Sequence, residues 1–130
     1  MKYTILEGAE AMRLEDIVRL LRTTYWAGQR PVEKIEASLQ HSDCYGVWLE
    51  EEAKLVGFAR VITDFATTYY LCDVVIEGAY RGRGLGTALL GHIESRPAYA
   101  GLRGLLLTRD AHGLYAKFGF RPADGRAMSK

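Results

Sequence analysis

The fold is decided by the stretch Asp73-Val74-Val75-Ile76-Glu77-Gly78-Ala79-Tyr80-Arg81-Gly82-Arg83-Gly84-Leu85-Gly86-Thr87. Its apolar start is typical of a strand that is covered on both faces. A helix is predicted from about residue 84 to residue 95, because apolar residues recur there at helical spacing and Pro97 follows. A strand, a glycine-rich turn and a helix therefore follow one another directly.

The glycine-rich turn suits an anionic ligand. Glycines allow successive backbone N–H groups to face one ligand, and the unpaired N–H groups and positive dipole of the following helix reinforce the same place. Arg81 and Arg83 add positive charge nearby. The alternative interpretation is that the glycines only permit a tight turn between strand and helix. This segment alone does not separate the two.

Two familiar nucleotide-binding motifs do not match this turn. A phosphate-binding P-loop needs Lys and then Ser or Thr after its last glycine, but Gly86 is followed by Thr87 and Ala88. A dinucleotide fingerprint starting at Gly82 and Gly84 needs a third glycine where Thr87 stands. Neither class of nucleotide-binding protein is favoured.

Upstream of this stretch the pattern predicts a strand, two helices and three strands. The predicted ranges are a strand over 3–6, an amphipathic helix over 12–24, a second helix from Pro31 carrying Ile35 and Leu39, a hairpin of strands over 44–50 and 55–63, and a strand over 67–76. The last of these leads into the glycine turn.

Downstream, strand and helix alternate again. We expect a strand over 102–108, a short helix over 110–117 capped by Asp110, and a final strand entered through Phe118-Gly119-Phe120. No linker or repeat divides the chain, so residues 1–130 are expected to form one α/β domain with a mixed sheet.

Composition excludes several classes of protein. Seventeen basic and sixteen acidic residues give a formal charge of +1, which argues against a nucleic-acid partner. No apolar run is long enough to cross a bilayer, so we expect a cytoplasmic protein with no membrane partner. Cys44 and Cys72 lie in predicted strands and suit buried thiols, while His41 and His92 lack partners for a metal site.

The motif Arg81-x-x-Gly84-x-Gly86 after an apolar strand resembles the acetyl-CoA signature of the GNAT superfamily of N-acetyltransferases. The order of elements resembles that family too, and Leu114-Tyr115-x-x-Phe118-Gly119-Phe120 supports it downstream. The resemblance implies a mostly antiparallel mixed sheet with flanking helices, whose fourth and fifth strands splay apart around the cofactor arm.

By the same resemblance, acetyl-CoA is the expected co-substrate. No metal is expected, because the sequence has no spaced set of Cys, His or carboxylate ligands. The strand residues expected to contact it are Val74, Val75 and Ile76, and its pyrophosphate is expected on the amides of Arg81, Gly82, Arg83, Gly84, Leu85, Gly86 and Thr87. The family commonly has an asparagine on the last short helix, where this chain has Asp110-Ala111-His112. This chain therefore has no asparagine there to make the family's contact with the cofactor arm.

The catalytic candidates are Tyr115 and Asp73. The resemblance implies that Tyr115 is the general acid for the departing thiolate, although Tyr115 also falls in an apolar helical stripe that suits packing. Asp73 is the best carboxylate for accepting the proton of the amine, and the alternative is a carboxylate that bonds a turn or pairs with an arginine.

The acceptor-binding candidates are Tyr25, Trp26 and Asp64. The two aromatic residues lie between the first two helices, where the resembling family often builds its acceptor pocket; core packing is the alternative. Asp64 ends a strand, where it either attracts an amine or forms a turn. His112 is a secondary catalytic candidate.

These expectations describe transfer of acetyl from acetyl-CoA to a primary amine of a small molecule or peptide. The alternative is a non-catalytic module that senses or binds acyl-CoA. Dimers are common among similar enzymes, so a homodimer is possible, but no segment of this sequence specifies an interface.

Overall fold

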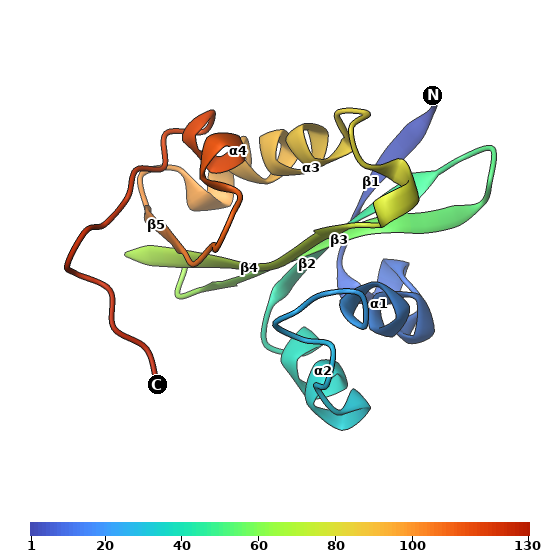
Figure 1. Cartoon of the computed structure of the whole chain (residues 1–130), viewed down its shortest axis with the longest axis horizontal. Coiled ribbons are helices and arrows are strands. Elements are labelled where there is room, and N and C mark those ends of the chain that lie inside the picture. Colours follow the sequence, from blue (N-terminus) through green and yellow to red (C-terminus); the bar gives the residue numbers. More distant parts are fainter.

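The structure is a computed structural model that describes residues 1–130 and contains one sheet with the strand order β1-β2-β3-β4-β5 (Figure 1). The strands are β1 (Tyr3–Glu7), β2 (Asp43–Leu49), β3 (Lys54–Thr63), β4 (Thr68–Ile76) and β5 (Arg103–Leu106). The helices are α1 (Leu14–Leu21), α2 (Val32–Leu39), α3 (Leu85–Glu94) and α4 (His112–Ala116), with 3-10 turns at Ala9–Ala11, Gly78–Tyr80 and Pro97–Tyr99.

The sheet is mixed and mostly antiparallel, as predicted. Strands β1 to β4 pair antiparallel in chain order, and β5 pairs parallel with β4. Helices α1 and α2 cover one face of the sheet, and α3 and α4 lie on the other (Figure 1). Each face has its own apolar core: Ile17, Leu20 and Ile35 belong to the first, and Leu89 and Ile93 belong to the second.

Strand β4 contributes to both cores, which confirms the expectation from its apolar run. Val75 is buried against the core under α1 and α2, whereas Val74 and Ile76 pack against the core under α3. Successive side chains of a strand point to opposite faces, so an apolar run without alternation fits a strand with helices on both sides. This strand therefore anchors the helices that frame the glycine turn.

A β-bulge interrupts the pairing of β3 and β4. The pair Arg60 and Cys72 is followed by the pair Phe58 and Val75, so three steps along β4 match two along β3. Asp73, in the extra segment, has a left-handed φ of 53°. A bulge bends the strand and re-aims the side chain it carries. No residue pattern in β3 or β4 predicts this bulge.

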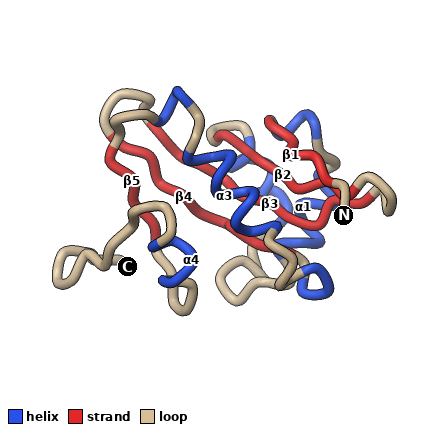
Figure 2. Tube along the Cα trace, turned by 90° about the horizontal axis from the view of Figure 1, so that it is seen from above, coloured by secondary structure: helices blue, strands red, loops and turns tan.

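The pairing of β4 with β5 stops halfway along β4. It joins Thr68–Leu71 to Arg103–Leu106, and β4 then continues to Ile76 with no strand on that side. Figure 2 shows β5 beside the first part of β4 only. The predicted strand over 102–108 is longer than the observed one. Because the two strands part, residues 72–76 of β4 keep one free edge.

The predicted final strand is wrong, because the Phe118-Gly119-Phe120 segment ends α4. Gly119 has a left-handed φ of 89°, its amide donates to the carbonyl of Ala116, and the Phe120 amide donates to that of Tyr115. These are the two bonds of a Schellman motif, the usual glycine stop of a helix. The residues after Phe120 form no strand.

Two helix ends also differ from prediction. The first helix stops at Leu21, because the hydroxyls of Thr23 and Thr24 bond back to the carbonyls of Leu20 and Leu21. The predicted cap at Asp110 is wrong: α4 begins after Ala111, whose amide donates to the Thr108 hydroxyl instead.

The core under α3 predicts that truncating a buried leucine lowers the free energy of unfolding more than truncating an exposed leucine does. Leu89 is fully buried, so Leu89→Ala should lower the free energy of unfolding by about 3 kcal/mol, because it removes apolar contacts and leaves a cavity. The matched control is Leu107→Ala, since Leu107 is 63% exposed, and its effect should stay within about 0.5 kcal/mol. Urea unfolding measures both; equal effects would contradict this packing.

Candidate active site

The glycine turn adopts a backbone that only glycine takes without strain. Gly82 and Gly84 have left-handed φ values of 76° and 81°. A Cβ placed on either residue would meet no atom within 4 Å, so their conformation, rather than lack of space, requires glycine. Leu85 then starts α3 with its side chain buried in the core. The turn is thereby fixed at the end of β4.

The backbone amides of residues 82–87 donate to no protein acceptor. The first backbone bond of α3 runs from the Ala88 amide to the Gly84 carbonyl, 3.0 Å away. The Arg81 amide differs from the expectation, because it already donates to the carbonyl of Gly78 at 3.3 Å. Six consecutive free donors at the positive end of a helix form a ready anion site.

The two arginines of the turn have different surroundings. The Nε of Arg81 donates to the carbonyl of Ile76 at 3.0 Å, so its guanidinium ties the turn to the end of β4. The guanidinium of Arg83 lies over the Tyr80 ring, 5.3 Å from its centroid. Both arginines are exposed and keep positive charge beside the free amides. The turn therefore places two charged guanidinium groups next to uncharged backbone N–H donors.

The predicted strand contacts lie along the free edge of β4. Val74, Val75 and Ile76 all fall in the part of β4 that β5 leaves unpaired. The Ile76 carbonyl is already bonded by Arg81, so it is less available to a ligand than the prediction assumed. The free edge leads directly into the glycine turn. A long ligand could thus bond the strand edge and the turn together.

Tyr115 lies on α4 with its ring buried against the α3 core. The ring meets Phe120 edge to face, with 6.1 Å between centroids. Burial raises its pKa to about 12, and the nearby charges of Tyr25 and Asp110 add to this rise. Its hydroxyl bonds no protein atom, and it is not among the buried polar atoms that lack a partner, so it reaches solvent. The side chain both packs the helix and presents a protonated hydroxyl.

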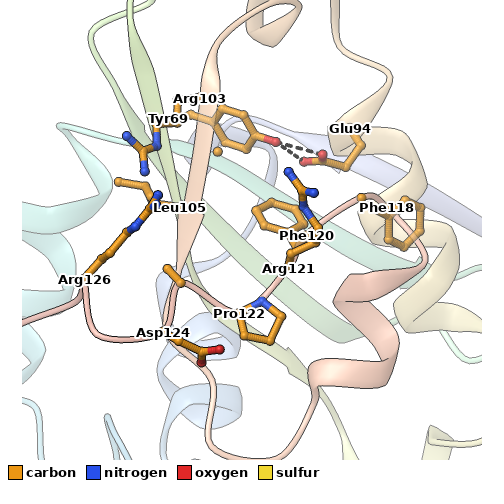
Figure 3. Close-up of a pocket in the computed structure, with 13 residues that line it drawn as sticks. Tyr69, Glu94, Arg103, Leu105, Phe118, Phe120, Arg121, Pro122, Asp124 and Arg126 are labelled. Carbon is orange, nitrogen blue, oxygen red and sulfur yellow. Dashed lines mark hydrogen bonds between the residues drawn. The ribbon is translucent and has the colours of Figure 1, made fainter.

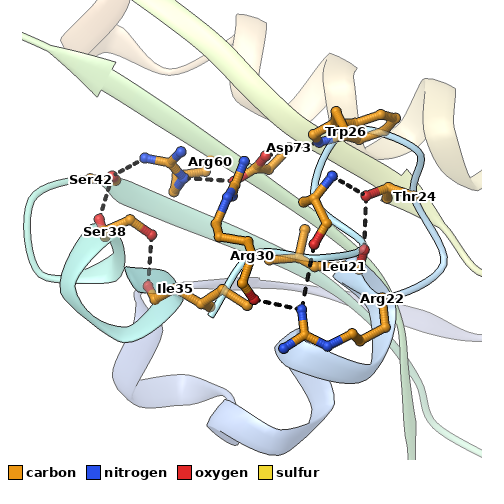
Figure 4. A network of polar contacts seen from close by, with 11 residues as sticks. Leu21, Arg22, Thr24, Trp26, Arg30, Ile35, Ser38, Ser42, Arg60 and Asp73 are labelled. Carbon is orange, nitrogen blue, oxygen red and sulfur yellow. Dashed lines mark hydrogen bonds and ion pairs between the residues drawn. The ribbon is translucent and has the colours of Figure 1, made fainter. Parts of the chain in front are cut away.

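Asp73 is the centre of a polar network on the α1 and α2 side of the sheet (Figure 4). Its Oδ1 accepts from the Nε1 of Trp26 at 2.9 Å. Its Oδ2 accepts from Nη1 of Arg30 at 2.8 Å and from Nε of Arg60 at 2.9 Å. Arg60 also donates to the hydroxyl of Ser42. The carboxylate is buried and links the α1–α2 loop to β3 and β4.

These contacts argue against Asp73 as a proton acceptor. Burial by itself raises its pKa, but the hydrogen bonds and charges of Arg30 and Arg60 outweigh that effect and hold the pKa below the ordinary 3.8. A carboxylate with a lowered pKa and three donors binds a proton weakly. Of the two interpretations left open by the sequence, the structure shows pairing with arginine.

The predicted aromatic pair Tyr25 and Trp26 is on the surface rather than in the core. Their exposed fractions are 57% and 43%, and the two rings meet edge to face. The guanidinium of Arg109, from the loop after β5, lies 3.8 Å from the centroid of the Tyr25 ring. This contact joins the α1–α2 loop to the β5–α4 loop. The pair therefore remains a candidate for acceptor binding.

Asp64 forms the β3–β4 turn. Its carboxylate accepts from the amides of Ala66, Thr67 and Thr68, which lower its pKa. It also lies at the end of β4 opposite the glycine turn, about 25 Å away along the strand. We assign it to the turn instead of to the acceptor site. His112 is exposed at the start of α4, and its side chain forms no hydrogen bond.

A groove beside β5 lies apart from the glycine turn (Figure 3). It has a volume of about 610 Å³ and runs between β5, the end of α3 and residues 118–126. At its back the hydroxyl of Tyr69 donates to the carboxylate of Glu94 at 2.8 Å. No residue of 72–76 or 81–87 lines it. The groove thus shares no lining residue with the free amides.

No group of three or more His, Cys, Asp or Glu side chains is arranged to hold a metal ion. Cys44 and Cys72 are free thiols, and burial raises their pKa values to about 12 and about 11. None of the helices is both long and apolar enough to cross a membrane.

Sequence reasoning missed three arginines of this region: Arg30, Arg60 and Arg109. Arg60 could have been found, because a charged residue inside the apolar run of β3 needs a buried partner. Arg30 and Arg109 lie in loops, where no sequence pattern indicates what an arginine contacts. Only the folded chain brings Arg30 onto Asp73 and Arg109 onto Tyr25.

The Asp73 network predicts how stability depends on pH. Asp73→Asn should lower the free energy of unfolding at pH 7 by about 3 kcal/mol, because two arginines lose their counter-charge. A depressed folded pKa stabilises the protein above the unfolded value near 3.8, and this contribution is lost as pH falls through the folded pKa. The difference from wild type should therefore shrink below about pH 4.

Urea unfolding from pH 3 to pH 8 measures this difference, with Asp124→Asn as a control for loss of an exposed carboxylate. An Asp73→Asn variant as stable as the control at pH 7 would rule out the proposed structural role of the network.

The comparisons with known proteins agree with this geometry. The family model described as the Acetyltransferase (GNAT) domain matches residues 42–122. A protein named Uncharacterized N-acetyltransferase ycf52, from Porphyra purpurea, is 27% identical over 92% of this chain and 71% of its own length. A Gibberella zeae protein, FG08082, which is assigned as an acetyltransferase by its name only, is 32% identical over 72% of this chain and 63% of its own length.

Among solved structures, a protein of Xanthomonas campestris pv. campestris assigned to the GNAT family superposes with a TM-score of 0.87. It is 37% identical, and the match covers 94% of this chain and 86% of that one. The chain spans about two thirds of the length of several curated relatives. The matched family model covers the bulge, the free edge of β4, the glycine turn and α4, and the chain belongs to the GNAT family of acetyltransferases.

Proposed function

We propose that this domain transfers the acetyl group of acetyl-CoA to a primary amine of a small molecule or peptide. The observation that carries the proposal is the row of six free amides at residues 82–87 beside an unpaired edge of β4. Membership of the GNAT family supports the reaction type. The donor and the acceptor class are the proposed parts.

The residues present fit a CoA thioester. The amides of residues 82–87, with Arg81 and Arg83, would hold the pyrophosphate, and the free edge of β4 at residues 74–76 would hold the amide-containing arm. Each hydrogen bond to a charged phosphate contributes about 1.5–3 kcal/mol, so local donors suffice although the net charge is only +1. When bound, acetyl-CoA supplies an acetyl thioester.

Tyr115 is the proposed donor to the sulfur. Its raised pKa keeps the hydroxyl protonated at neutral pH, and the hydroxyl has no competing partner in the protein. The same raised pKa makes it a weaker acid than free tyrosine, so we expect it to stabilise developing negative charge on the sulfur through a hydrogen bond. The resemblance to the GNAT superfamily supports the choice of Tyr115 for this role.

Solvent water is the proposed acceptor of the proton that the amine loses. Asp73 already accepts from three side chains and is a weak base, and Asp64 is occupied by its own turn. An ordinary alkylammonium with a pKa near 10.4 needs about 4–5 kcal/mol to lose its proton at pH 7. We therefore expect the rate to rise with pH up to the pKa of the bound amine.

A glycine substitution tests the cofactor turn. Gly84→Ala should raise the dissociation constant of acetyl-CoA about ten-fold, because alanine at a φ of 81° costs about 1–2 kcal/mol and the turn must shift its amides. Gly78→Ala is the matched control: it lies in the same connection, has open space and lacks a positive φ. Calorimetry measures both, and equal affinities would argue against the turn as the binding site.

A second substitution tests Tyr115. Tyr115→Phe should lower kcat about 100-fold in a thiol-release assay over a panel of amines and leave acetyl-CoA affinity within two-fold, because only the hydroxyl is lost. Unchanged kcat would remove the role of Tyr115 but not the activity. Binding of acetyl-CoA without turnover of any amine would instead favour a non-catalytic acyl-CoA sensor. Failure to bind acetyl-CoA would overturn the proposed function.

A further inference from the structure

The Asp73 network carries more positive than negative charge. Arg30 and Arg60 both bond the same oxygen of Asp73, and neither forms an ion pair with any other carboxylate. Trp26, the third partner, is neutral. Two guanidinium groups against one carboxylate leave an excess of one positive charge. An anionic ligand would compensate that excess through charge-assisted hydrogen bonds.

Both arginines also keep unused donors. Arg30 donates only through Nη1, so its Nε and Nη2 have no partner, and Arg60 leaves Nη2 free. These nitrogens reach solvent, because the Nε of Arg96 is the only buried side-chain polar atom without a partner. The side chains of Arg30 and Arg60 are 25% and 12% exposed. The cluster thus offers charged donors to a ligand from a largely fixed position.

The cluster lies beside the proposed reaction centre. Asp73 directly precedes Val74 at the free edge of β4, and Trp26 above it neighbours Tyr25. Arg109, from the loop that leads into α4, lies over the Tyr25 ring, and α4 carries Tyr115. Figure 4 shows the Arg30 and Arg60 side chains converging on Asp73 from the loop and from β3. An acceptor held there would have its amine within reach of the free edge.

We propose that Arg30 and Arg60 bind an anionic group of the acceptor, so that the substrate is an amine that also carries a carboxylate or a phosphate. The proposal rests on the acetyltransferase function proposed above and names the substrate class. The guanidinium group is planar and always charged, and it forms short charge-assisted bonds with either anion. Arg109 adds no further excess of positive charge, because the carboxylate of Asp110 lies 3.8 Å from its guanidinium.

Matched pairs of amines test the substrate class. One pair is a dipeptide with a free C-terminal carboxylate and the same dipeptide as its C-terminal amide; the other is an amino sugar with and without a phosphate. We expect kcat/KM to be at least ten-fold higher for the anionic member of at least one pair, mainly through KM. Which pair shows the preference tells whether the anion is a carboxylate or a phosphate.

Variants of Arg30 test the site, because Arg30 is the more exposed of the two arginines. Arg30→Gln should reduce the ratio of kcat/KM for the anionic acceptor to kcat/KM for its neutral counterpart at least five-fold. Arg30→Lys should retain part of the preference. The matched control is Arg13→Gln, because Arg13 is an exposed arginine at the start of α1 whose ion pair is with Glu15. Thermal midpoints of all variants show whether each one is folded.

A binding measurement keeps the inference separate from turnover. Calorimetry of wild type with CoA should show that the N-acetylated dipeptide carboxylate, or the acetylated sugar phosphate, binds at least ten-fold more tightly than its neutral counterpart. The inference is overturned if the enzyme turns over neutral amines, both members of each pair react at equal rates, and their acetylated products bind with equal affinity. The proposed function then stays intact. Without any turnover, the product affinities alone decide: a preference for the anion supports the site, and equal affinities overturn it.

Discussion

The backbone turn at residues 81–87 is the constraint on which the rest of the site depends. Its two left-handed glycines let the chain pass from β4 into α3 without using the amides of residues 82–87. Buried backbone donors are almost always paired, so these amides must face solvent or a ligand. Leu85 fixes the turn from below by packing into the α3 core. The packing of α3 therefore holds the turn in place, while the two glycines leave its amides free.

Strand β4 connects this turn to the other half of the site. Its pairing with β5 ends after Leu71, which leaves an edge, and its bulge places Asp73 on the opposite side of the sheet from α3. A buried carboxylate requires partners, and it finds them in Trp26 and Arg30 of the α1–α2 loop. One strand thus provides the free edge beside the glycine turn and anchors the α1–α2 loop through Asp73.

The structure changes the interpretation of two residues, and it does so for the same reason. Asp73 was identified as a candidate base because a carboxylate on a central strand needs an explanation, and the explanation is its pair of arginines. Phe120 is expected from the sequence at the entry to a final strand, but it closes a Schellman motif and packs on Tyr115. In both cases the deciding partner lies outside the local sequence window that suggested the first interpretation.

The sequence by itself determined the element order from Tyr3 to Ala116, the mixed sheet and the glycine turn, because these follow from short-range periodicity and from the conformational freedom of glycine. Only the tertiary structure decided where β5 leaves β4, that Asp73 sits in a bulge, and that Arg30, Arg60 and Arg109 gather near the aromatic loop. Those features depend on which distant segments come into contact, and a buried or paired charge acquires its chemistry from these contacts rather than from its neighbours in the chain.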